Sequence, residues 1–320
     1  MAAGIIGTGS YLPSLTVSNQ DLEKIMDTTD EWIKSRTGIE RRHIAVEETT
    51  VSMAVEAARL ALENAGVSPS ELDLILVGTI SPDHFFPSTA CEVQKALAAE
   101  NATAFDISAA CSGFLFGLGI VNAYMAAGMI KTALVIGAET LSKLMDWNDR
   151  GTCVLFGDGA GAAVIRRQDE GILSMVQGSD GGRGEVLTCE NRKVNNPYRK
   201  NPSDLSFTAM NGQEVYKFAV RTVPASVDEA LMKAGVRADE IKYFILHQAN
   251  IRIIEAVAKR LGQPIEKFPT NLQECGNISA GSVPILLDFV NRQGKLQKGD
   301  KIVLAGFGAG LTWGAAVLIW

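Results

Sequence analysis

The sequence predicts an α/β protein built from two similar halves, each with a sheet covered by helices. Two observations predict this class. Short aliphatic runs alternate with segments whose apolar residues recur at helical spacing, and parts of the first half recur in the second. Alternating strands and helices are typical of layered α/β folds. The length of 320 residues allows about two domains, or two halves of one large domain.

The first half alternates helices and strands in order. An Ala-rich segment, 51–64, has apolar residues at helical spacing and is followed by Gly66, a common helix stop. A short aliphatic run predicts a buried strand at 72–78, and two further short runs predict strands at 103–107 and 132–137.

Segment 107–130 separates the last two strands and contains no Asp, Glu, Lys or Arg. It is long enough to cross a bilayer. However, it also carries Cys111, Asn122 and four glycines, and predicted strands flank it on both sides. We therefore expect a helix buried on all faces within a protein that does not enter the membrane.

The chain repeats itself along its length. The similar segments are 65–76 with 234–245, 133–137 with 302–306, and 161–165 with 314–318. The first two pairs share an offset of 169 residues, and the third has an offset of 153. A repeat this long predicts a duplication and not a solenoid. We expect halves at residues 1–170 and 171–320, with the functional site between them.

Composition and charge exclude several classes of protein. The net charge is −6 and the pI is about 5.3, whereas a protein that coats nucleic acid is normally basic. The five cysteines contain no C-x-x-C pair, so a zinc ribbon or redox dithiol has no support. An odd cysteine count and an N-terminus without a basic leader region predict a cytoplasmic location.

Cys111 is the candidate nucleophile. It follows the strand at 103–107 after a short turn and begins the apolar helix. A helix N-terminus has free N–H groups and a partial positive charge, which predict a lowered thiol pKa. The alternative is a small buried apolar residue, as most free cysteines are. The other cysteines lack this setting and are expected to be packing residues: Cys91, Cys153, Cys189 and Cys275.

His247 is the best catalytic candidate among the three histidines because it closes the aliphatic strand at 243–246. In open α/β sheets, ligands bind beyond the carboxyl ends of the strands. A hydrogen-bonded structural histidine is the alternative. His43 is expected in a charged, exposed segment and His84 in a loop. Asn277 lies in a turn of small residues, where a lone Asn is usually structural.

Three further segments are predicted to form loops or turns. Segment 178–204 is rich in Gly, Asn and Pro and lacks periodicity, which indicates a surface insertion or a lid. Segment 304–314 is a Gly-rich turn between two strands, without the Lys and the following helix of a phosphate loop. It is better suited to presenting a backbone N–H to a site. Segment 157–161 is Gly-rich but lies between strands, so it fails the context of a dinucleotide loop.

Taken together, these segments resemble the β-ketoacyl-acyl-carrier-protein synthase III family, the initiating condensing enzymes of type II fatty-acid synthesis. The resemblance covers essentially the whole chain. The motifs that carry it are Thr29-Asp30-Glu31-Trp32-Ile33, Arg36-Thr37-Gly38-Ile39, Ala109-Ala110-Cys111-Ser112-Gly113-Phe114, Phe156-Gly157-Asp158-Gly159-Ala160-Gly161, His247-Gln248-Ala249-Asn250-Ile251-Arg252, Gly276-Asn277-Ile278-Ser279 and Thr312-Trp313-Gly314.

The resemblance implies a thiolase-like fold with five α-β-α-β-α layers, and a homodimer. It implies that Cys111 attacks an acyl-CoA, acetyl-CoA being the expected primer, and forms an acyl-enzyme. The N–H groups of Cys111 and Ala309 would bind the oxyanion. His247 and Asn277 would hydrogen-bond the thioester carbonyl of malonyl-acyl-carrier protein and stabilise the enolate formed as CO₂ leaves. No metal or bound cofactor is implied.

The resemblance also assigns binding residues. The adenine of CoA would lie between Trp32 and Arg150, and acidic acyl carrier protein would dock on Gln248 and Arg252. The remaining assignments are Thr28, Arg36 and Asn250 for CoA, and Phe86 (reaching the partner subunit) and Leu311 for the acyl pocket. Leu311 departs from the family, which usually has Phe there, so the primer stays open.

Other functions remain as alternatives. The nearest is a specialised condensing enzyme of the same superfamily, making a polyketide or a quinolone. A Cys–His–Asn hydrolase uses the same residue types, but the Cys-Gly-Ser-Cys-Trp run of papain-like enzymes is absent. A non-catalytic acyl-binding protein would not need all three of Cys111, His247 and Asn277.

Overall fold

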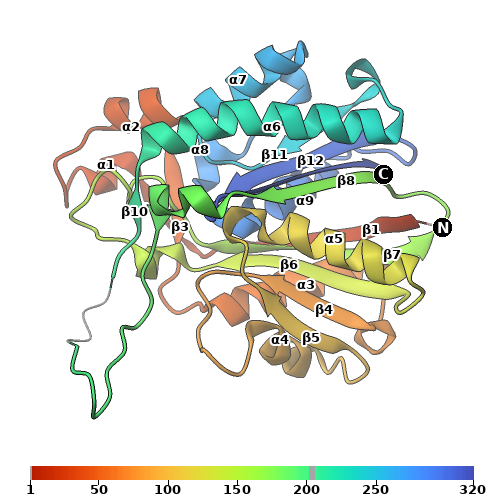
Figure 1. The fold of residues 1–320 in the computed structure, drawn as a ribbon, viewed down its shortest axis with the longest axis horizontal. Coiled ribbons are helices and arrows are strands. Elements are labelled where there is room, and N and C mark those ends of the chain that lie inside the picture. The colour runs from red at the N-terminus through yellow and green to blue at the C-terminus, as the bar shows by residue number, and fades with distance from the viewer. Residues whose placement is uncertain (1, 202–205) are drawn as a thin grey trace.

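The computed structural model describes residues 2–201 and 206–320. Two large sheets lie one above the other, with helices between them and on both outer faces (Figure 1). From top to bottom in Figure 1, the layers are helix, sheet, helix, sheet and helix. The predicted α/β class and five-layer order are confirmed.

The first sheet has the strand order β1-β7-β6-β4-β5. β4 is parallel to β5 and β6, whereas β7 is antiparallel to β1 and β6. Helices α3 and α4 cover its outer face and α5 its inner face (Figure 1). The bounds are β1 (Ala2–Tyr11), α3 (Thr50–Ala65), β4 (Leu74–Gly78), α4 (Thr89–Leu97), β5 (Thr103–Ile107), α5 (Gly113–Ala126), β6 (Thr132–Glu139) and β7 (Gly159–Gln168).

The second sheet has the order β11-β12-β13-β8. β11 and β12 are parallel, and the other pairs are antiparallel. Helices α6 and α7 lie outside, and α9 lies beside α5 in the central layer (Figure 1). The bounds are β8 (Ile172–Ser179), α6 (Gly212–Ala234), β11 (Tyr243–Leu246), α7 (Ile251–Leu261), α9 (Ser282–Arg292), β12 (Lys301–Gly308) and β13 (Thr312–Ile319).

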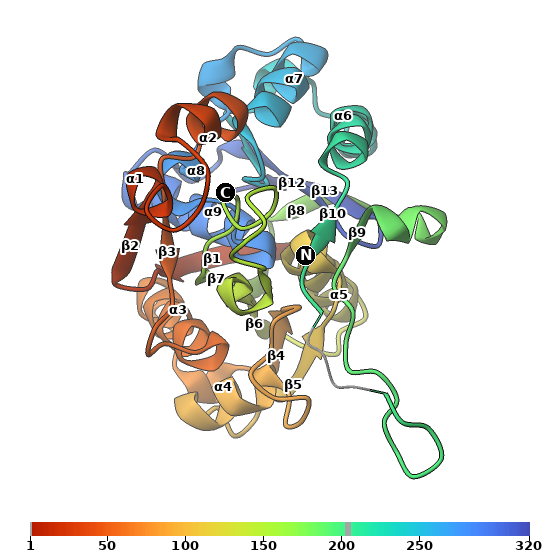
Figure 2. The same ribbon diagram turned by 90° about the vertical axis from the view of Figure 1, so that its left-hand side faces the viewer.

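Shorter elements surround the sheets. Figure 2 shows α1, α2 and α8 together at the end of the molecule that carries α7. The bounds are β2 (Leu15–Ser18), α1 (Asn19–Leu22), α2 (Asp30–Thr37), β3 (Arg41–Ile44), β9 (Leu187–Thr188), β10 (Ala209–Met210) and α8 (Leu272–Cys275). β2 pairs with β3, and β9 with β10.

The elements themselves repeat at the predicted offset. β6 and β12 begin and end 169 residues apart, and so do the 3₁₀ turns η2 (Ala110–Ser112) and η7 (Ser279–Gly281). The first residue of each turn, Ala110 or Ser279, has a φ of 45°. Few residues with a side chain adopt this left-handed conformation. The duplication is thus visible in the backbone, and we propose residue 170, between β7 and β8, as its boundary.

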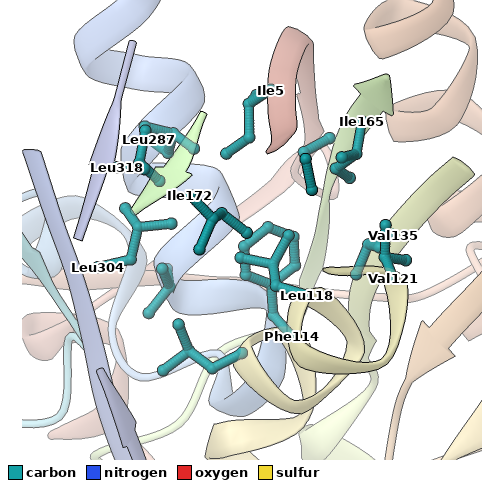
Figure 3. Close-up of a cluster of buried hydrophobic side chains, with 14 of the residues drawn as sticks. Ile5, Phe114, Leu118, Val121, Val135, Ile165, Ile172, Leu287, Leu304 and Leu318 are labelled. Atoms are coloured by element: carbon teal, nitrogen blue, oxygen red, sulfur yellow. The ribbon is translucent and has the colours of Figure 1, made fainter. Parts of the chain in front are cut away.

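The central helices bury one hydrophobic cluster that joins the two sheets. Phe114, Leu118 and Val121 of α5 are fully buried. The cluster also contains Ile5, Val135 and Ile165 from the first sheet, and Ile172, Leu287, Leu304 and Leu318 from the second half (Figure 3). The predicted burial of α5 on all faces holds only for its first part, because Ala123 and Ala126 are exposed. In residues 2–201 and 206–320, no helix is long and apolar enough to span a bilayer.

The loop predicted at 178–204 is shorter than expected. β8 continues to Ser179, and a 3₁₀ turn, Gly181–Val186, and β9 follow. The chain after β9 leaves the body of the molecule as an extended arm (Figure 1). The end of the predicted loop, from residue 202 to Asp204, lies outside the described residues.

Two predictions of exposure are wrong. The segment around His43 is not exposed throughout, because Arg42 is fully buried. Its guanidinium donates hydrogen bonds to the carbonyl oxygens of Val17 (3.2 Å) and Val154 (2.8 Å), which compensate part of the lost hydration. Cys189, expected to be a packing residue, is exposed.

Candidate active site

Cys111 lies at the centre of the η2 turn, between β5 and α5. Its side chain is 8% exposed. The left-handed φ of Ala110 makes the turn tight, so the chain changes direction just before the thiol. Cys111 therefore stands just beyond the carboxyl end of β5, where the sequence predicts a nucleophile.

Two glycines let β12 pass directly against Cys111. A Cβ at Gly308 would lie 2.6 Å from the nitrogen of Cys111, and one at Gly306 would lie 3.7 Å from its carbonyl oxygen. The backbone of β12 can therefore lie this close to the Cys111 N–H only because residue 308 has no side chain. Ala309 has a negative φ. Across the described residues, neither its N–H nor that of Cys111 donates to a backbone carbonyl. Both remain available as donors, and their role in binding an oxyanion stays a prediction.

His247 approaches the same place from the second sheet. It follows β11, and its backbone N–H donates to the carbonyl of Ala305 (2.8 Å). A Cβ at Gly306 would lie 3.4 Å from His247 Cβ, so the same glycine touches both His247 and Cys111. The imidazole packs edge-on against Phe307, with 5.4 Å between ring centroids. Burial lowers the pKa of His247 to about 3, so the imidazole is neutral at pH 7.

Asn277 is fixed by its backbone and by its side-chain oxygen. Its N–H donates to Leu155 (2.9 Å), and its carbonyl accepts from Gly157 (3.0 Å) in a short parallel bridge. Its Oδ1 accepts from the N–H of Ser279 (2.8 Å). Because the oxygen is used in this way, the NH₂ group is directed elsewhere and can donate to a ligand. The η7 turn that follows Asn277 packs against η2, which carries Cys111.

The thiol of Cys111 is more basic than the sequence predicts. Burial raises its pKa to about 12, the Ser279 hydroxyl acts in the opposite direction, and the charge of Glu139 raises the pKa further. The predicted lowering of the pKa at the helix N-terminus is wrong, because desolvation of the thiolate outweighs the helix dipole. At neutral pH the thiol is protonated, so attack on a substrate requires a proton acceptor.

The residues predicted to bind CoA gather around Trp32. The guanidinium groups of Arg36 and Arg150 lie 4.8 and 5.1 Å from the centre of its ring. Arg150 also donates to the carbonyl of Asp27 (2.6 Å), and Asn250 Nδ2 donates to the carbonyl of Arg36 (2.9 Å). An aromatic ring with two guanidinium groups close to it suits a planar base, although CoA binding here stays a prediction.

The other predicted binding residues differ in exposure. Arg252 is exposed, as docking requires. Gln248 is only 1% exposed and its amide bonds to backbone groups, which offers a carrier protein little surface, and its docking role stays a prediction. Phe86 is 87% exposed and Leu311 is buried. The Thr28 hydroxyl is buried and has no hydrogen-bond partner among the described residues.

Comparison with known proteins decides the family. Residues 105–181 match the family 3-oxoacyl-[acyl-carrier-protein] synthase III, and residues 231–320 match its C-terminal part. The β-ketoacyl-[acyl-carrier-protein] synthase III of Clostridium acetobutylicum is 50% identical over 318 residues, which cover 99% of this chain and 98% of that protein. The chain belongs to the β-ketoacyl-acyl-carrier-protein synthase III family.

Solved structures of synthase III enzymes share the fold throughout. The enzyme of Aquifex aeolicus VF5 is 48% identical, with a TM-score of 0.94 over 99% of this chain and 100% of that one. The priming β-ketosynthase of the R1128 polyketide pathway is 38% identical, also with a TM-score of 0.94, over 99% of this chain and 96% of that one. The predicted family, thiolase-like fold and enzyme class are confirmed.

Two residues of this synthase site have no predicted role. Glu139 ends β6 and Ser279 begins η7, and both side chains affect the pKa of Cys111. The sequence contains a feature that could have identified each of these two residues. Glu139 closes an aliphatic strand, as His247 does, and the offset of 169 pairs Ser279 with Ala110, the residue before the nucleophile.

Proposed function

We propose that the chain catalyses the initiating decarboxylative condensation of an acyl-CoA with malonyl-acyl-carrier protein, giving a 3-oxoacyl-acyl-carrier protein. The observation that carries this proposal is the meeting of Cys111 and His247 at Gly306 of β12, with the η7 turn packed against the turn of Cys111, within a synthase III chain. Cys111 and His247 each follow a strand, and Asn277 lies just before η7.

In the first half-reaction, Cys111 Sγ attacks the thioester carbon of the acyl-CoA. The carbonyl oxygen becomes negative and accepts hydrogen bonds from the N–H groups of Cys111 and Ala309. Two backbone N–H groups that donate to no backbone carbonyl among the described residues support this assignment. CoA then leaves as its thiol, and the acyl group stays on Cys111.

In the second half-reaction, malonyl-acyl-carrier protein occupies the site vacated by CoA. A neutral His247 and the Asn277 amide can both donate a hydrogen bond to its thioester carbonyl. These bonds stabilise the enolate as the C–C bond to the carboxylate breaks and CO₂ leaves. The carbanion then attacks the acyl carbon on Cys111, the bond between that carbon and Sγ breaks, and the released thiolate takes up a proton from solvent to regenerate the thiol.

The chain's own groups suffice for this chemistry, so we propose no metal or bound cofactor. We place the reaction in the cytoplasm, where CoA thioesters and reduced cysteines occur together. We also propose a homodimer, in which Phe86 enters the partner's acyl pocket. The 87% exposure of this large apolar side chain supports such a contact, because an aromatic ring gains from leaving water.

A two-stage assay tests the function. Incubation of the purified chain with labelled acetyl-CoA is expected to transfer label to Cys111, found by peptide mass, with release of one CoA. Addition of malonyl-acyl-carrier protein is then expected to release CO₂ and form labelled acetoacetyl-carrier protein. Acylation without any condensation product contradicts the proposal.

The docking of the carrier protein predicts a selective effect at Arg252. Acyl carrier protein is acidic, so Arg252→Glu replaces an attraction by a repulsion at an exposed position. We expect KM for malonyl-acyl-carrier protein to rise about tenfold, while acylation by acetyl-CoA is unchanged. Steady-state kinetics at two ionic strengths measures this, with Arg237→Glu as an exposed control away from α7. Equal losses in both half-reactions would refute the docking role.

A priming role in polyketide synthesis is the second candidate function. It is favoured by the likeness to the R1128 priming β-ketosynthase and by Leu311, which is buried and smaller than the family's usual Phe. A series of acetyl, branched and longer acyl-CoA primers separates the two functions. A clear preference for a longer or branched primer favours the second.

A further inference from the structure

Glu139 is a buried carboxylate with one oxygen paired and one free. Its Oε2 accepts from the hydroxyls of Thr79 (3.2 Å) and Ser81 (2.5 Å) and from the N–H of Ile80 (3.1 Å). Its Oε1 is buried and has no hydrogen-bond partner within the described part of the chain. A buried acceptor without a hydrogen-bond partner destabilises the folded protein, so its presence here indicates a functional role for Glu139.

The strand directs Glu139 toward the turn that faces the nucleophile. Gly137 and Glu139 are two residues apart on β6 and so lie on the same face of the strand. A Cβ at Gly137 would lie 2.0 Å from the carbonyl oxygen of Ala280 in η7. This face of β6 is therefore in contact with η7, and η7 packs against the η2 turn of Cys111.

Ser279 begins η7, the turn that contacts both β6, which carries Glu139, and η2, which carries Cys111. Its hydroxyl oxygen is buried and has no hydrogen-bond partner among the described residues, as is the case for Glu139 Oε1. Ser279 also lowers the pKa of both Cys111 and Glu139. A hydroxyl in this position can accept a proton from one neighbour and give its own to the other.

Glu139 can act as a proton acceptor near neutral pH, once bond formation at the sulfur has made the thiol proton acidic. Burial raises the pKa of Glu139 to about 7, with smaller opposing effects from Ser81, Ile80, Ser279 and Thr79. Near neutral pH, both forms of such a carboxyl group are accessible. Cys111 holds its proton until a substrate arrives, because burial disfavours the free thiolate.

We propose that Glu139, acting through Ser279, takes the proton of Cys111 during acylation and returns it to the departing CoA. This inference rests on the proposed function, since it takes an acyl-CoA as the acyl donor. As Sγ bonds to the thioester carbon, its S–H bond breaks and the proton passes to Ser279 Oγ. The Ser279 proton passes to Glu139 Oε1.

The reverse transfer completes the step. When the tetrahedral adduct collapses, the bond between the acyl carbon and the CoA sulfur breaks. The proton returns from Glu139 through Ser279 to that sulfur. The products are acyl-Cys111, the CoA thiol and the Glu139 carboxylate, so protons balance and no other reactant is consumed. Glu139 is thus a relay residue that acts through Ser279.

Glu139→Gln tests the relay, because glutamine keeps the size of the side chain but cannot take up the proton. We expect the rate of CoA release in a single turnover with acetyl-CoA to fall about 10²-fold. Ser279→Ala is expected to cause a similar loss. The double variant is expected to be no slower than the slower single variant, since both act on one path.

Alkylation of Cys111 by iodoacetamide separates the relay from a simple charge effect. If Glu139 were only a negative neighbour, Glu139→Gln would lower the thiol pKa and speed alkylation. The relay predicts slower alkylation. Asp288→Asn is the matched control, because Asp288 is also buried and bonds to Thr8 and Ser10, away from Cys111. It is expected to acylate at the normal rate.

Folding and site integrity are checked separately. Release of CO₂ from malonyl-acyl-carrier protein, with Cys111 already alkylated, is expected to be unchanged in Glu139→Gln and Ser279→Ala. If Glu139→Gln does not fold, the acylation rate of Ser279→Ala tests the relay in its place. Acylation within about threefold of normal in a folded variant, or faster alkylation, overturns the relay. Failure of the proposed function looks different, because the unaltered chain would then form no acyl-Cys111 from acetyl-CoA.

Discussion

Cys111→Ala is expected to form no acyl-enzyme and to lose condensation activity by at least about 10³-fold. The alanine keeps the η2 turn, including the left-handed φ of Ala110, but removes the atom that bonds to the acyl group. Intact-protein mass after incubation with acetyl-CoA measures the first effect, and formation of acetoacetyl-carrier protein measures the second.

Cys91→Ala is the matched control for this loss. Cys91 lies in α4, is partly buried and contacts the carbonyl of Ala104, far from β12. It is expected to acylate and condense normally. Retention of an acetyl adduct in Cys111→Ala, or its loss in Cys91→Ala, would show that another cysteine is the nucleophile.

Asn277→Asp is expected to reduce condensation by about 10²–10³-fold while leaving acylation nearly intact. The substitution is almost isosteric. An aspartate oxygen can still accept from the Ser279 N–H, as Oδ1 of Asn277 does at 2.8 Å, so the turn is preserved. Only the NH₂ donor is lost, and a negative charge faces the position where the enolate develops.

The two half-reactions separate the outcomes for Asn277→Asp. CoA release measures acylation, and CO₂ release from malonyl-acyl-carrier protein measures decarboxylation. Burial of the new carboxyl group raises its pKa, so partial recovery of decarboxylation at low pH is expected, where the protonated acid can donate. Equal losses of CoA release and CO₂ release would instead mean that Asn277 only supports the turn.

Features set by local pattern are predictable from this sequence. The runs at 72–78 and 132–137 form the strands β4 and β6, whose burial on both faces demands apolar residues throughout. The run at 103–107 forms the edge strand β5, which is only partly buried. The offset of 169 appears again in β6 and β12, since duplicated segments with the same pattern adopt the same local structure. Cys111 and His247 are likewise predictable as candidate catalytic residues, because both follow a strand.

Features set by contacts between distant segments are not predictable in this way. The pKa of Cys111 depends on desolvation by β12 and on Glu139, which stand far away in sequence. Gln248 follows a strand like its neighbour His247, but its amide turns inward to the chain's own backbone. The interior position of Arg42 likewise depends on carbonyl groups of two separate strands or loops.

The hydrophobic cluster around α5 and α9 has a consequence for how the molecule unfolds. Ile5 and Leu118 come from the first half, whereas Leu287 and Leu304 come from the second, and all lie in one cluster (Figure 3). Separation of the halves would expose this surface on both, at a cost on the order of 1.5–3 kcal/mol for each large side chain. The halves resemble each other as folds, but they share one core, so they are expected to melt together as a single cooperative unit.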